Sequence, residues 1–155
     1  MNNRLNVGFD FDGVIHKDVG KTDNNGQRHP TIPFNKISSN PFIEIIKLIK
    51  VYKKINANVY IITARTSNYK KLIMSSLNKY GVQLLDKNII CTGDTGGDKI
   101  QYLEGLNINH FYDDSIYHFR RIIHEKRKNK LQKLIKLYLT IPEQNKIAEI
   151  KIDYL

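Results

Sequence analysis

Short alternating runs of apolar residues, separated by longer amphipathic stretches, are the dominant pattern along this chain. The first run is Leu5, Val7 and Phe9, and Gly13 stands where such a strand is expected to turn out of its sheet. Similar short runs occupy residues 58–62, 88–91 and 110–112. Strands that alternate with helices in this way predict an α/β protein.

The stretches between these runs predict helices. Apolar residues recur at helical spacing over residues 42–55, with Asn40 as a candidate N-cap and Pro41 as the first helical residue. A second helix is expected over residues 68–80, where Gly81 is placed to end it. A short helix is expected to begin at Lys99.

The last third of the chain is basic, and its pattern is less regular. After Ser115 a basic helix is expected to run to about Lys128. Residues 134–141 alternate well enough for an edge strand, although their apolar residues equally suit a continued helix. Residues 142–155 carry no informative pattern.

This order of elements predicts one domain over residues 1–155, with a three-layer, doubly wound (Rossmann-like), mostly parallel sheet of about five strands. A chain of 155 residues with 41% hydrophobic content is sufficient for one buried sheet. Residues 15–40 are polar and contain Gly20, Gly26, Pro30 and Pro33, which suggests a small flap and no full cap domain. Residues 116–141 form a basic C-terminal segment.

The charge balance favours anionic partners. The chain has 25 basic and 15 acidic residues, a net charge of +10, and the excess is concentrated after Ser115. A basic surface attracts nucleic acid or nucleotides in a salt-dependent way, and tyrosines such as Tyr102, Tyr112 and Tyr117 can stack on bases. The alternative is that the many Lys, Asn, Ile and Tyr residues reflect A/T-rich coding, and that these tyrosines are packing residues.

Cysteine usage and hydropathy indicate a protein of the cytoplasm. The single cysteine, Cys91, excludes an internal disulfide framework and is expected to be a buried strand residue rather than a reactive thiol. The N-terminus leads directly into the first strand, and no window approaches the roughly 18 apolar residues that a membrane helix needs. We therefore expect a soluble, intracellular protein.

Two carboxylates stand at the end of the first strand. Asp10 and Asp12 are two positions apart, so their side chains are expected on the same side, at the edge where open parallel sheets bind ligands. One carboxylate can attack phosphorus while the other handles a proton. The same pair also occurs in calcium loops and in ordinary turns, so it does not define a phosphatase by itself.

Three further polar segments follow the later strands in order along the chain. They are Thr63-Ala64-Arg65-Thr66, Gly96-Gly97-Asp98-Lys99 and Asp113-Asp114-Ser115. Together with the first, they resemble the four motifs of the haloacid dehalogenase (HAD) superfamily of phosphohydrolases, over residues 5–115. A HAD-like fold is therefore expected.

The resemblance implies a role for each catalytic position. Asp10 is the implied nucleophile, Asp12 the general acid and then base, Thr63 a hydrogen-bond partner of the phosphoryl group, and Lys99 a fixed positive charge. Taken singly, Thr63 would equally suit a helix cap and Lys99 a solvated lysine.

The resemblance also implies a magnesium site and a substrate surface. Mg2+ would be held by the Asp10 carboxylate, the Asp12 backbone carbonyl and Asp113, with Asp114 in support, although Asp114 alone would also suit an N-cap. The candidate substrate-binding residues are Gly13, Ala64, Arg65, Arg120 and Arg121. Arg65 would clamp a second phosphate or the body of a nucleotide.

The second aspartate narrows the implied chemistry. In the family, members that dehalogenate lack it and cation-pumping ATPases carry threonine there, so Asp12 favours phosphatase chemistry. A weaker similarity is to the 3'-phosphatase domain of polynucleotide kinases, although no kinase P-loop is present. Val14, where threonine is frequent, is a small departure from the family pattern.

The favoured function is a Mg2+-dependent phosphomonoesterase that uses an aspartyl-phosphate and acts on a nucleotide or a nucleic-acid terminal phosphate. One alternative is a phosphatase of sugars or other small metabolites, closed by the flap or by a dimer. The other is a non-catalytic HAD-fold protein that binds nucleic acid or protein.

Overall fold

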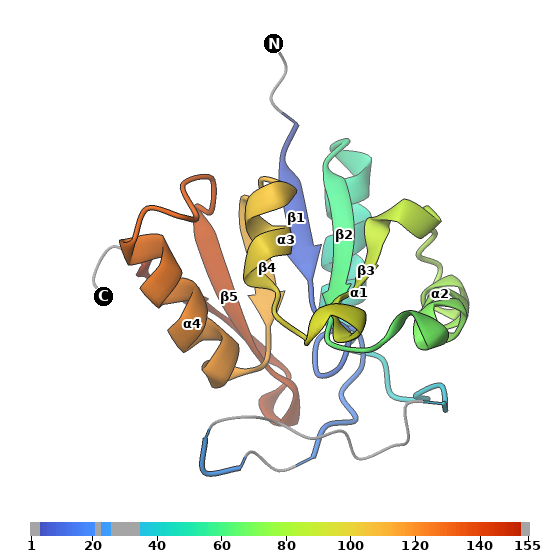
Figure 1. Cartoon of the computed structure of the whole chain (residues 1–155). Helices are drawn as coiled ribbons and strands as arrows, with labels where there is room; N and C mark the ends of the chain where they lie inside the picture. Colours follow the sequence, from blue (N-terminus) through green and yellow to red (C-terminus); the bar gives the residue numbers. More distant parts are fainter. Residues whose placement is uncertain (1–3, 21–22, 26–34, 153–155) are drawn as a thin grey trace.

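A six-stranded sheet forms the centre of the molecule (Figure 1). The computed structural model describes residues 4–20, 23–25 and 35–152. The strands are β1 (Asn6–Phe9), β2 (Asn58–Thr63), β3 (Ile89–Cys91), β4 (His110–Asp113), β5 (Lys136–Ile141) and β6 (Lys146–Ile150). Their order is β3-β2-β1-β4-β5-β6, in which β6 is antiparallel to β5 and the other pairs are parallel. The predicted α/β class and mostly parallel sheet are confirmed.

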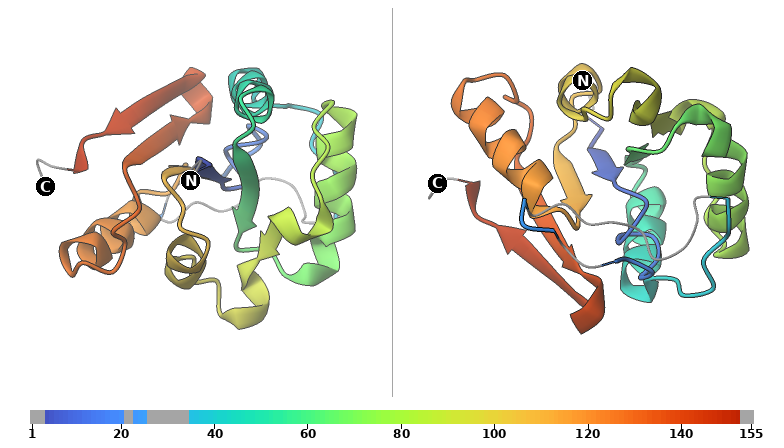
Figure 2. Two further views of the ribbon diagram at one scale, coloured as in Figure 1. Left: turned by 90° about the horizontal axis from the view of Figure 1, so that it is seen from above. Right: turned by 60° about the horizontal axis from the view of Figure 1, so that its bottom comes forward.

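Helices cover both faces of this sheet (Figure 2). They are α1 (Ile43–Lys54), α2 (Lys70–Lys79), α3 (Ile100–Gly105) and α4 (Ile116–Arg127). Helices α1 and α2 pack on one face together with Ile61 and Tyr112. Helices α3 and α4 pack on the other face with Ile62 and Phe111. Neighbouring residues of a strand thus belong to apolar clusters on opposite faces of the sheet. This is expected, because successive side chains of a strand point to opposite faces and both faces are buried.

Short 3-10 turns connect several of these elements. They are η1 (Ser67–Tyr69), η2 (Asp86–Asn88), η3 (Thr92–Thr95) and η4 (Pro142–Gln144). The expected helix over residues 68–80 is therefore a 3-10 turn followed by α2. Gly81 follows this helix with φ +75°, the left-handed conformation that favours glycine.

The end of the sheet differs from the prediction. Residues 134–141 were expected to form an edge strand, but β5 lies between β4 and β6 and is internal. The edge strand is β6, in the segment where the sequence carried no informative pattern, and it raises the strand number from about five to six. Ile147, Ala148 and Ile150 are each only half-buried, which explains the weak alternation.

The start of α1 also differs from the prediction. The helix begins at Ile43 with Phe42 as its N-cap, so the assignment of Asn40 as N-cap and Pro41 as first helical residue is wrong. Pro41 instead forms an antiparallel bridge with His16, and the Phe42 amide donates to the Ile15 carbonyl at 2.9 Å. This short extended pairing ties the segment before α1 to the loop after β1.

Part of the predicted flap, residues 15–40, lies outside the described residues, namely 21–22 and 26–34. Its two described ends are joined, because the Ser38 hydroxyl donates to the Asp18 carboxylate and the Lys17 amide donates to the Asn40 carbonyl. The Tyr80 hydroxyl also donates to the Ser38 carbonyl, which anchors these ends to α2. In the described part of the chain, no helix is both long and apolar enough to cross a membrane.

Candidate active site

Asp10 leaves β1 at the carboxyl end of the sheet. Its amide donates to the Tyr112 carbonyl of β4 at 2.9 Å, which continues the strand pairing by one residue. Its side chain is 7% exposed, and the Oδ1 atom accepts from the Phe11 amide at 2.7 Å and lies 2.9 Å from Lys99 Nζ. The candidate nucleophile is therefore buried and held in place.

Lys99 bridges two strand ends. Its Nζ atom lies 2.9 Å from both Asp10 Oδ1 and Asp113 Oδ2, and its side chain is buried. Burial alone would lower the pKa of this ammonium group, but the two carboxylates raise it above its usual value. Lys99 is therefore a fixed positive charge, as the motif resemblance implied, and not a solvated lysine.

Asp113, the last residue of β4, is completely buried. Its Oδ1 atom accepts from the Ser115 amide at 2.8 Å, and its Oδ2 atom lies 2.8 Å from His118 Nδ1. Burial would raise the pKa of this carboxyl group, but His118 and Lys99 outweigh burial and hold it below its usual range. Asp113 is therefore a carboxylate.

His118 was not found by sequence reasoning. It lies in the first turn of α4, where the Ser115 hydroxyl accepts a hydrogen bond from its amide at 3.4 Å. The available signal was its position five residues after Asp113, in a helix that begins at the motif itself. That spacing brings the ring back onto the strand end.

Asp10, Asp113 and His118 could hold a metal ion, because one ligand atom of each lies within 4.8 Å of the others. The two carboxylates suit Mg2+ or Mn2+, with remaining positions left for water and substrate, whereas an imidazole is a usual ligand of transition metals and not of Mg2+. This set includes Asp10 and Asp113 of the implied magnesium ligands, and it adds His118. The side chains of Asp12 and Asp114 are not part of it.

Asp114 packs against the loop after β1. It is 5% exposed, and a Cβ atom added to Gly13 would lie 2.2 Å from Asp114 Oδ2. Gly13 also has φ +74°, so glycine is required there both for the backbone and for the space. The Gly13 carbonyl accepts from the Thr140 hydroxyl of β5 at 2.8 Å.

The Asp12 carboxylate is held by two partners of its own, Arg65 and His16. Arg65 Nε donates to Oδ2 at 2.9 Å and an Arg65 terminal nitrogen donates to Oδ1 at 2.6 Å, a bidentate pairing. His16 Nε2 lies 3.0 Å from Oδ1, while the Asp18 amide donates to His16 Nδ1 at 3.2 Å. His16, four residues after Asp12, is a second site residue that sequence reasoning missed.

These contacts fix the protonation of Asp12. Burial would raise the pKa of this carboxyl group, but the hydrogen bonds from Arg65 and then His16 outweigh burial and lower the pKa to about 2. The Asp12 side chain keeps 22% exposure, so water reaches it. In this arrangement Asp12 is ionised and has no proton to donate, and its low pKa makes it a weak base, so both of its implied proton-transfer roles require Arg65 to move.

Asp10 has the opposite shift. Burial raises its pKa to about 6, because the lowering effect of Lys99 is incomplete and Asp113 adds a like charge. Asp10 and Asp12, two residues apart, thus have pKa values pushed in opposite directions, which is a feature of sites that divide acid, base and nucleophile roles.

Thr63 is the last residue of β2, and Ala64 follows it. Thr63 is buried, and its hydroxyl accepts from the Arg65 amide at 3.3 Å. The η3 turn passes close by, since a Cβ atom at Gly93 would lie 2.5 Å from the Ala64 carbonyl oxygen. Ala64 is exposed. The roles implied for both residues stay predictions.

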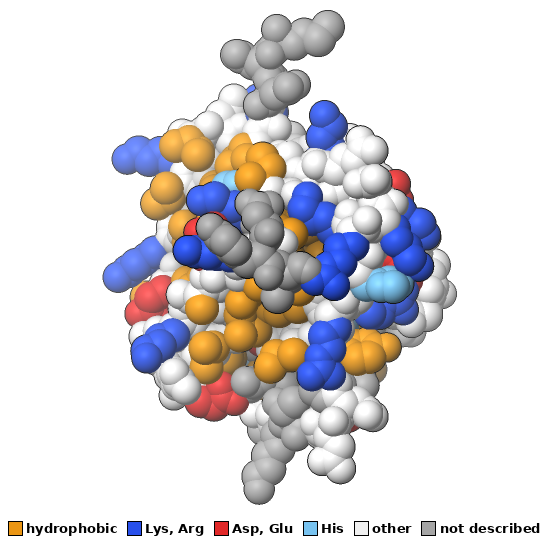
Figure 3. Space-filling view, turned by 90° about the vertical axis from the view of Figure 1, so that its left-hand side faces the viewer, with side chains coloured by type: hydrophobic (Ala, Val, Ile, Leu, Met, Phe, Trp, Pro, Cys, Tyr) orange, Lys and Arg blue, Asp and Glu red, His pale blue; other side chains and the backbone are white. Residues whose placement is uncertain are grey.

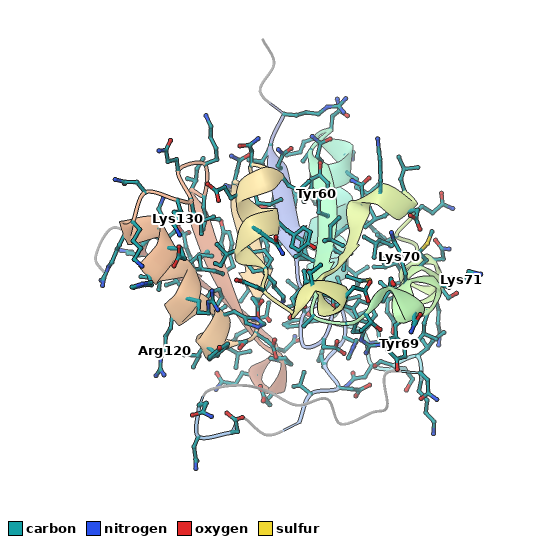
Figure 4. The ribbon with its side chains drawn as sticks, in the orientation of Figure 1. Tyr60, Tyr69, Lys70, Lys71, Arg120 and Lys130 are labelled. Carbon is teal, nitrogen blue, oxygen red and sulfur yellow. The ribbon has the colours of Figure 1, made fainter. Side chains whose placement is uncertain are left out.

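The basic C-terminal segment is partly neutralised within the chain. Arg121 donates to Asp98 at 3.0 Å, Lys126 to the Leu134 carbonyl at 2.7 Å, and Lys130 and Lys136 pair with Glu125 and Glu149. Figure 3 shows Lys and Arg side chains spread over this side of the molecule, with hydrophobic side chains between them. Arg120, in α4, and Lys130, just beyond it, lie toward opposite ends of that helix (Figure 4). The segment does not form one continuous basic stripe.

The three tyrosines considered for base stacking have different environments. Tyr112 is buried, with its ring stacked between Phe9 and Tyr138 at 4.6 and 4.3 Å, so it is a packing residue. The Tyr102 hydroxyl lies 3.0 Å from the Thr95 hydroxyl. Tyr117, on α4, is 40% exposed. Cys91 ends β3 half-buried, and burial raises the pKa of its thiol, which agrees with an unreactive strand residue.

Comparison with known proteins identifies a relative of unstated activity. No sequence model of a known family matches the chain. The chain is 41% identical over 141 residues to the uncharacterised protein L684 of Acanthamoeba polyphaga mimivirus, an alignment that covers 89% of this chain. It spans only 28% of the length of that relative.

Among solved structures, the chain resembles the hypothetical protein PH1952 from Pyrococcus horikoshii OT3. The two share 15% sequence identity and a TM-score of 0.37, over 86% of this chain and 46% of the other. A similarity this distant carries no information on function.

Proposed function

We propose that this protein is a Mg2+-dependent phosphomonoesterase of the haloacid dehalogenase type, with the three-layer arrangement of that family and an aspartyl-phosphate at Asp10. The observation that carries the proposal is the position of Lys99 Nζ, 2.9 Å from both Asp10 and Asp113, at the carboxyl ends of two neighbouring parallel strands. A nucleophilic carboxylate, a fixed cation and a second carboxylate are the groups that phosphoryl transfer through an acyl-phosphate needs.

In the first step, an Asp10 carboxylate oxygen attacks phosphorus and the bond to the substrate oxygen breaks. Lys99 lies beside the nucleophile and offsets the negative charge of the phosphoryl oxygens, and the buried setting strengthens that interaction. Thr63, at the neighbouring strand end, is the proposed hydrogen-bond partner of the phosphoryl group. The leaving oxygen takes a proton, which the resemblance assigns to Asp12.

In the second step, water attacks the phosphorus of the aspartyl-phosphate, and the bond between phosphorus and the Asp10 oxygen breaks. Asp12 is the proposed acceptor of the proton of that water, because its side chain is ionised and solvent-accessible. The Arg65 and His16 contacts that lower its pKa to about 2 also weaken it as a base, so this role requires the Arg65 pairing to open.

The residues proposed to hold Mg2+ are Asp10 and Asp113, with His118 beside them and the Asp12 backbone carbonyl and Asp114 as further candidates. The cation would supply Lewis-acid stabilisation of the transferring phosphoryl group. Its charge would also keep Asp10 ionised at a pH where burial otherwise favours its protonated form.

The favoured substrate is a nucleotide or a nucleic-acid terminal phosphate. The net charge of +10 supports a polyanionic partner, although the internal pairing of Arg121, Lys126 and Lys130 weakens that argument. The alternative of a small-metabolite phosphatase closed by residues 15–40 or by a second copy predicts that free sugar phosphates are turned over at least as fast as nucleotides.

The experiment that tests the proposal is Mg2+-dependent phosphate release from nucleotides, 3'- and 5'-phosphorylated oligonucleotides and sugar phosphates. Asp10→Asn should abolish release, because an amide cannot form the acyl-phosphate, while Asp86→Asn, an exposed acidic residue in η2, serves as the matched control. A phosphorylated Asp10 should be detectable by mass spectrometry after an acid quench. Full activity of Asp10→Asn would rule out the nucleophile assignment.

The non-catalytic alternative has its own signature. If neither wild type nor variant releases phosphate, and Asp10→Asn leaves the binding of nucleic acid or protein unchanged, the fold serves binding alone.

A further inference from the structure

A small cavity adjoins the candidate active site. It has a volume of about 100 Å3 and lies between residues 96–100 and one face of α4. Lys99 and His118 line it, and both also contact Asp113 in the site itself. A substrate whose phosphate lies at Asp10 therefore has this groove next to it, which we name the α4 groove.

One wall of the α4 groove is bare backbone. Gly96 and Gly97 have φ +85° and +81°, and a Cβ atom built on either meets no heavy atom within 4 Å. Two consecutive residues thus present no side chain toward the groove. A flat group can approach such a wall more closely than it can approach side chains.

The facing wall carries Tyr117. Its side chain is 40% exposed, although aromatic residues are usually more buried, and it belongs to the α4 turn that also carries His118. Ile122, one turn further along, is buried and closes the apolar side of the groove. The groove is therefore lined by an exposed aromatic side chain and by open backbone, a combination that fits a planar ring.

The rim of the α4 groove is polar and carries both a donor and an acceptor. Arg121 donates through one terminal nitrogen to Asp98 at 3.0 Å, and both side chains line the groove and are more than 40% exposed. That bond uses one of the five N–H groups of arginine, and the carboxylate has a second oxygen. A guanidinium and a carboxylate side by side match the mixed donor and acceptor edge of a nucleobase.

We propose that the α4 groove binds the nucleoside of the leaving group, with its base on Tyr117 and the edge of that base, or a second phosphate, at Arg121. This assignment rests on the proposed phosphatase function and names its substrate class. Of the tyrosines and arginines considered for substrate binding, it assigns this role to Tyr117 and Arg121. Tyr112 is buried, and Arg120 does not line the groove. A free mononucleotide and the end of an oligonucleotide share the chemistry that the groove recognises.

The test compares substrates that share a phosphate and differ in the base. AMP and ribose 5-phosphate form such a pair, and 3'- and 5'-phosphorylated oligonucleotides distinguish an end from a free nucleotide. Tyr117→Ala should lower kcat/KM for AMP by about tenfold, the size of one base–aromatic stacking contact, and leave ribose 5-phosphate nearly unchanged. Tyr117→Phe, which keeps the ring, should retain most of the AMP activity, and Arg127→Gln at the end of α4 is the control.

Arg121→Gln should raise KM for AMP severalfold with little change in kcat, because it changes binding and touches no reacting atom. If wild type hydrolyses both AMP and ribose 5-phosphate, and Tyr117→Ala lowers both equally or neither, the groove assignment is overturned while the phosphatase function stands. Turnover of phosphotyrosine with the same dependence on Tyr117, and none of AMP, would also overturn it in favour of a peptide substrate.

A binding measurement tests the α4 groove separately if the protein proves not to be a phosphatase. If wild type hydrolyses no substrate, AMP binding to Asp10→Asn is measured by isothermal titration calorimetry, with and without Tyr117→Ala. Weaker binding on loss of the ring supports the α4 groove as a nucleoside site. Unchanged or absent AMP binding overturns it.

Discussion

Asp10 and Asp12 are two positions apart in the chain, yet their surroundings raise the pKa of Asp10 to about 6 and lower the pKa of Asp12 to about 2. The cause is the partner each one meets. Asp10 shares Lys99 with Asp113 and is buried beside that like charge, whereas Asp12 has the full guanidinium of Arg65 and the ring of His16. One carboxylate is therefore costly to ionise and the other is easily ionised.

A stability measurement tests the Asp10 environment. Burial raises the folded-state pKa of Asp10 from 3.8 to about 6, so its protonated form favours folding and that contribution is lost as pH rises from about 4 through 6. Asp10→Asn has no titrating group at this position, so it does not lose this stability as pH rises. In EDTA, the variant should gain stability relative to wild type between pH 5 and pH 8, measured by urea unfolding, and an equal difference at both pH values would contradict the shift.

The Arg65 pairing has a second measurable consequence. Arg65→Gln removes a bidentate partner from a carboxylate that is mostly buried, and should cost about 2 kcal/mol of unfolding free energy at pH 7. In the Asp12→Asn background the same change should cost much less, because no charge is then left without its partner. Additive costs in this double-mutant cycle would show that the two side chains do not interact.

At the scale of elements, the sequence predicted the four motif-bearing strands and the helices between them within a few residues, because their apolar periodicity is strong. It misplaced the start of α1, since the bridge between His16 and Pro41 is a long-range contact that no local pattern carries. It missed β6 because that strand is half-buried, and it missed His16 and His118 because each depends on a turn geometry visible only once the chain is folded. The positions of Asp10 and Asp113 follow from parallel strands that end at one edge, and Lys99, the N-cap of α3, reaches both of them.

Helix α4 depends on its N-terminal cap. The Ser115 hydroxyl accepts from the His118 amide, whereas Asp113 is bonded to the Ser115 backbone amide and not to its side chain. Ser115→Ala should therefore cost about 0.5–1 kcal/mol of unfolding free energy and leave most of the activity in place. Ser75→Ala, at an exposed position within α2, is the control, and equal effects of both changes would show that the cap contributes nothing.

At the scale of the whole molecule, the charge of +10 overstates the basic surface available to a polyanion. Arg121, Lys126, Lys130 and Lys136 are each bonded within the chain. The salt dependence of oligonucleotide affinity should therefore correspond to about one to three phosphate contacts, not to all eight basic residues between Arg120 and Lys136. A plot of log affinity for Asp10→Asn against log salt concentration measures this slope, and a slope near −7 would indicate that these ion pairs open on binding.

The central position of β1 also bears on how the protein is made. Asp10, the proposed nucleophile, follows the strand β1, which lies between β2 and β4, and its charge partners Lys99 and Asp113 follow about a hundred residues later in the chain. A nascent chain that has emerged only as far as α2 can pair β1 on one side alone, so the other edge of this apolar strand stays open. The ribosome-bound intermediate is therefore the stage at which this chain is most exposed to aggregation or to capture by chaperones, and the candidate active site is among the last features to form.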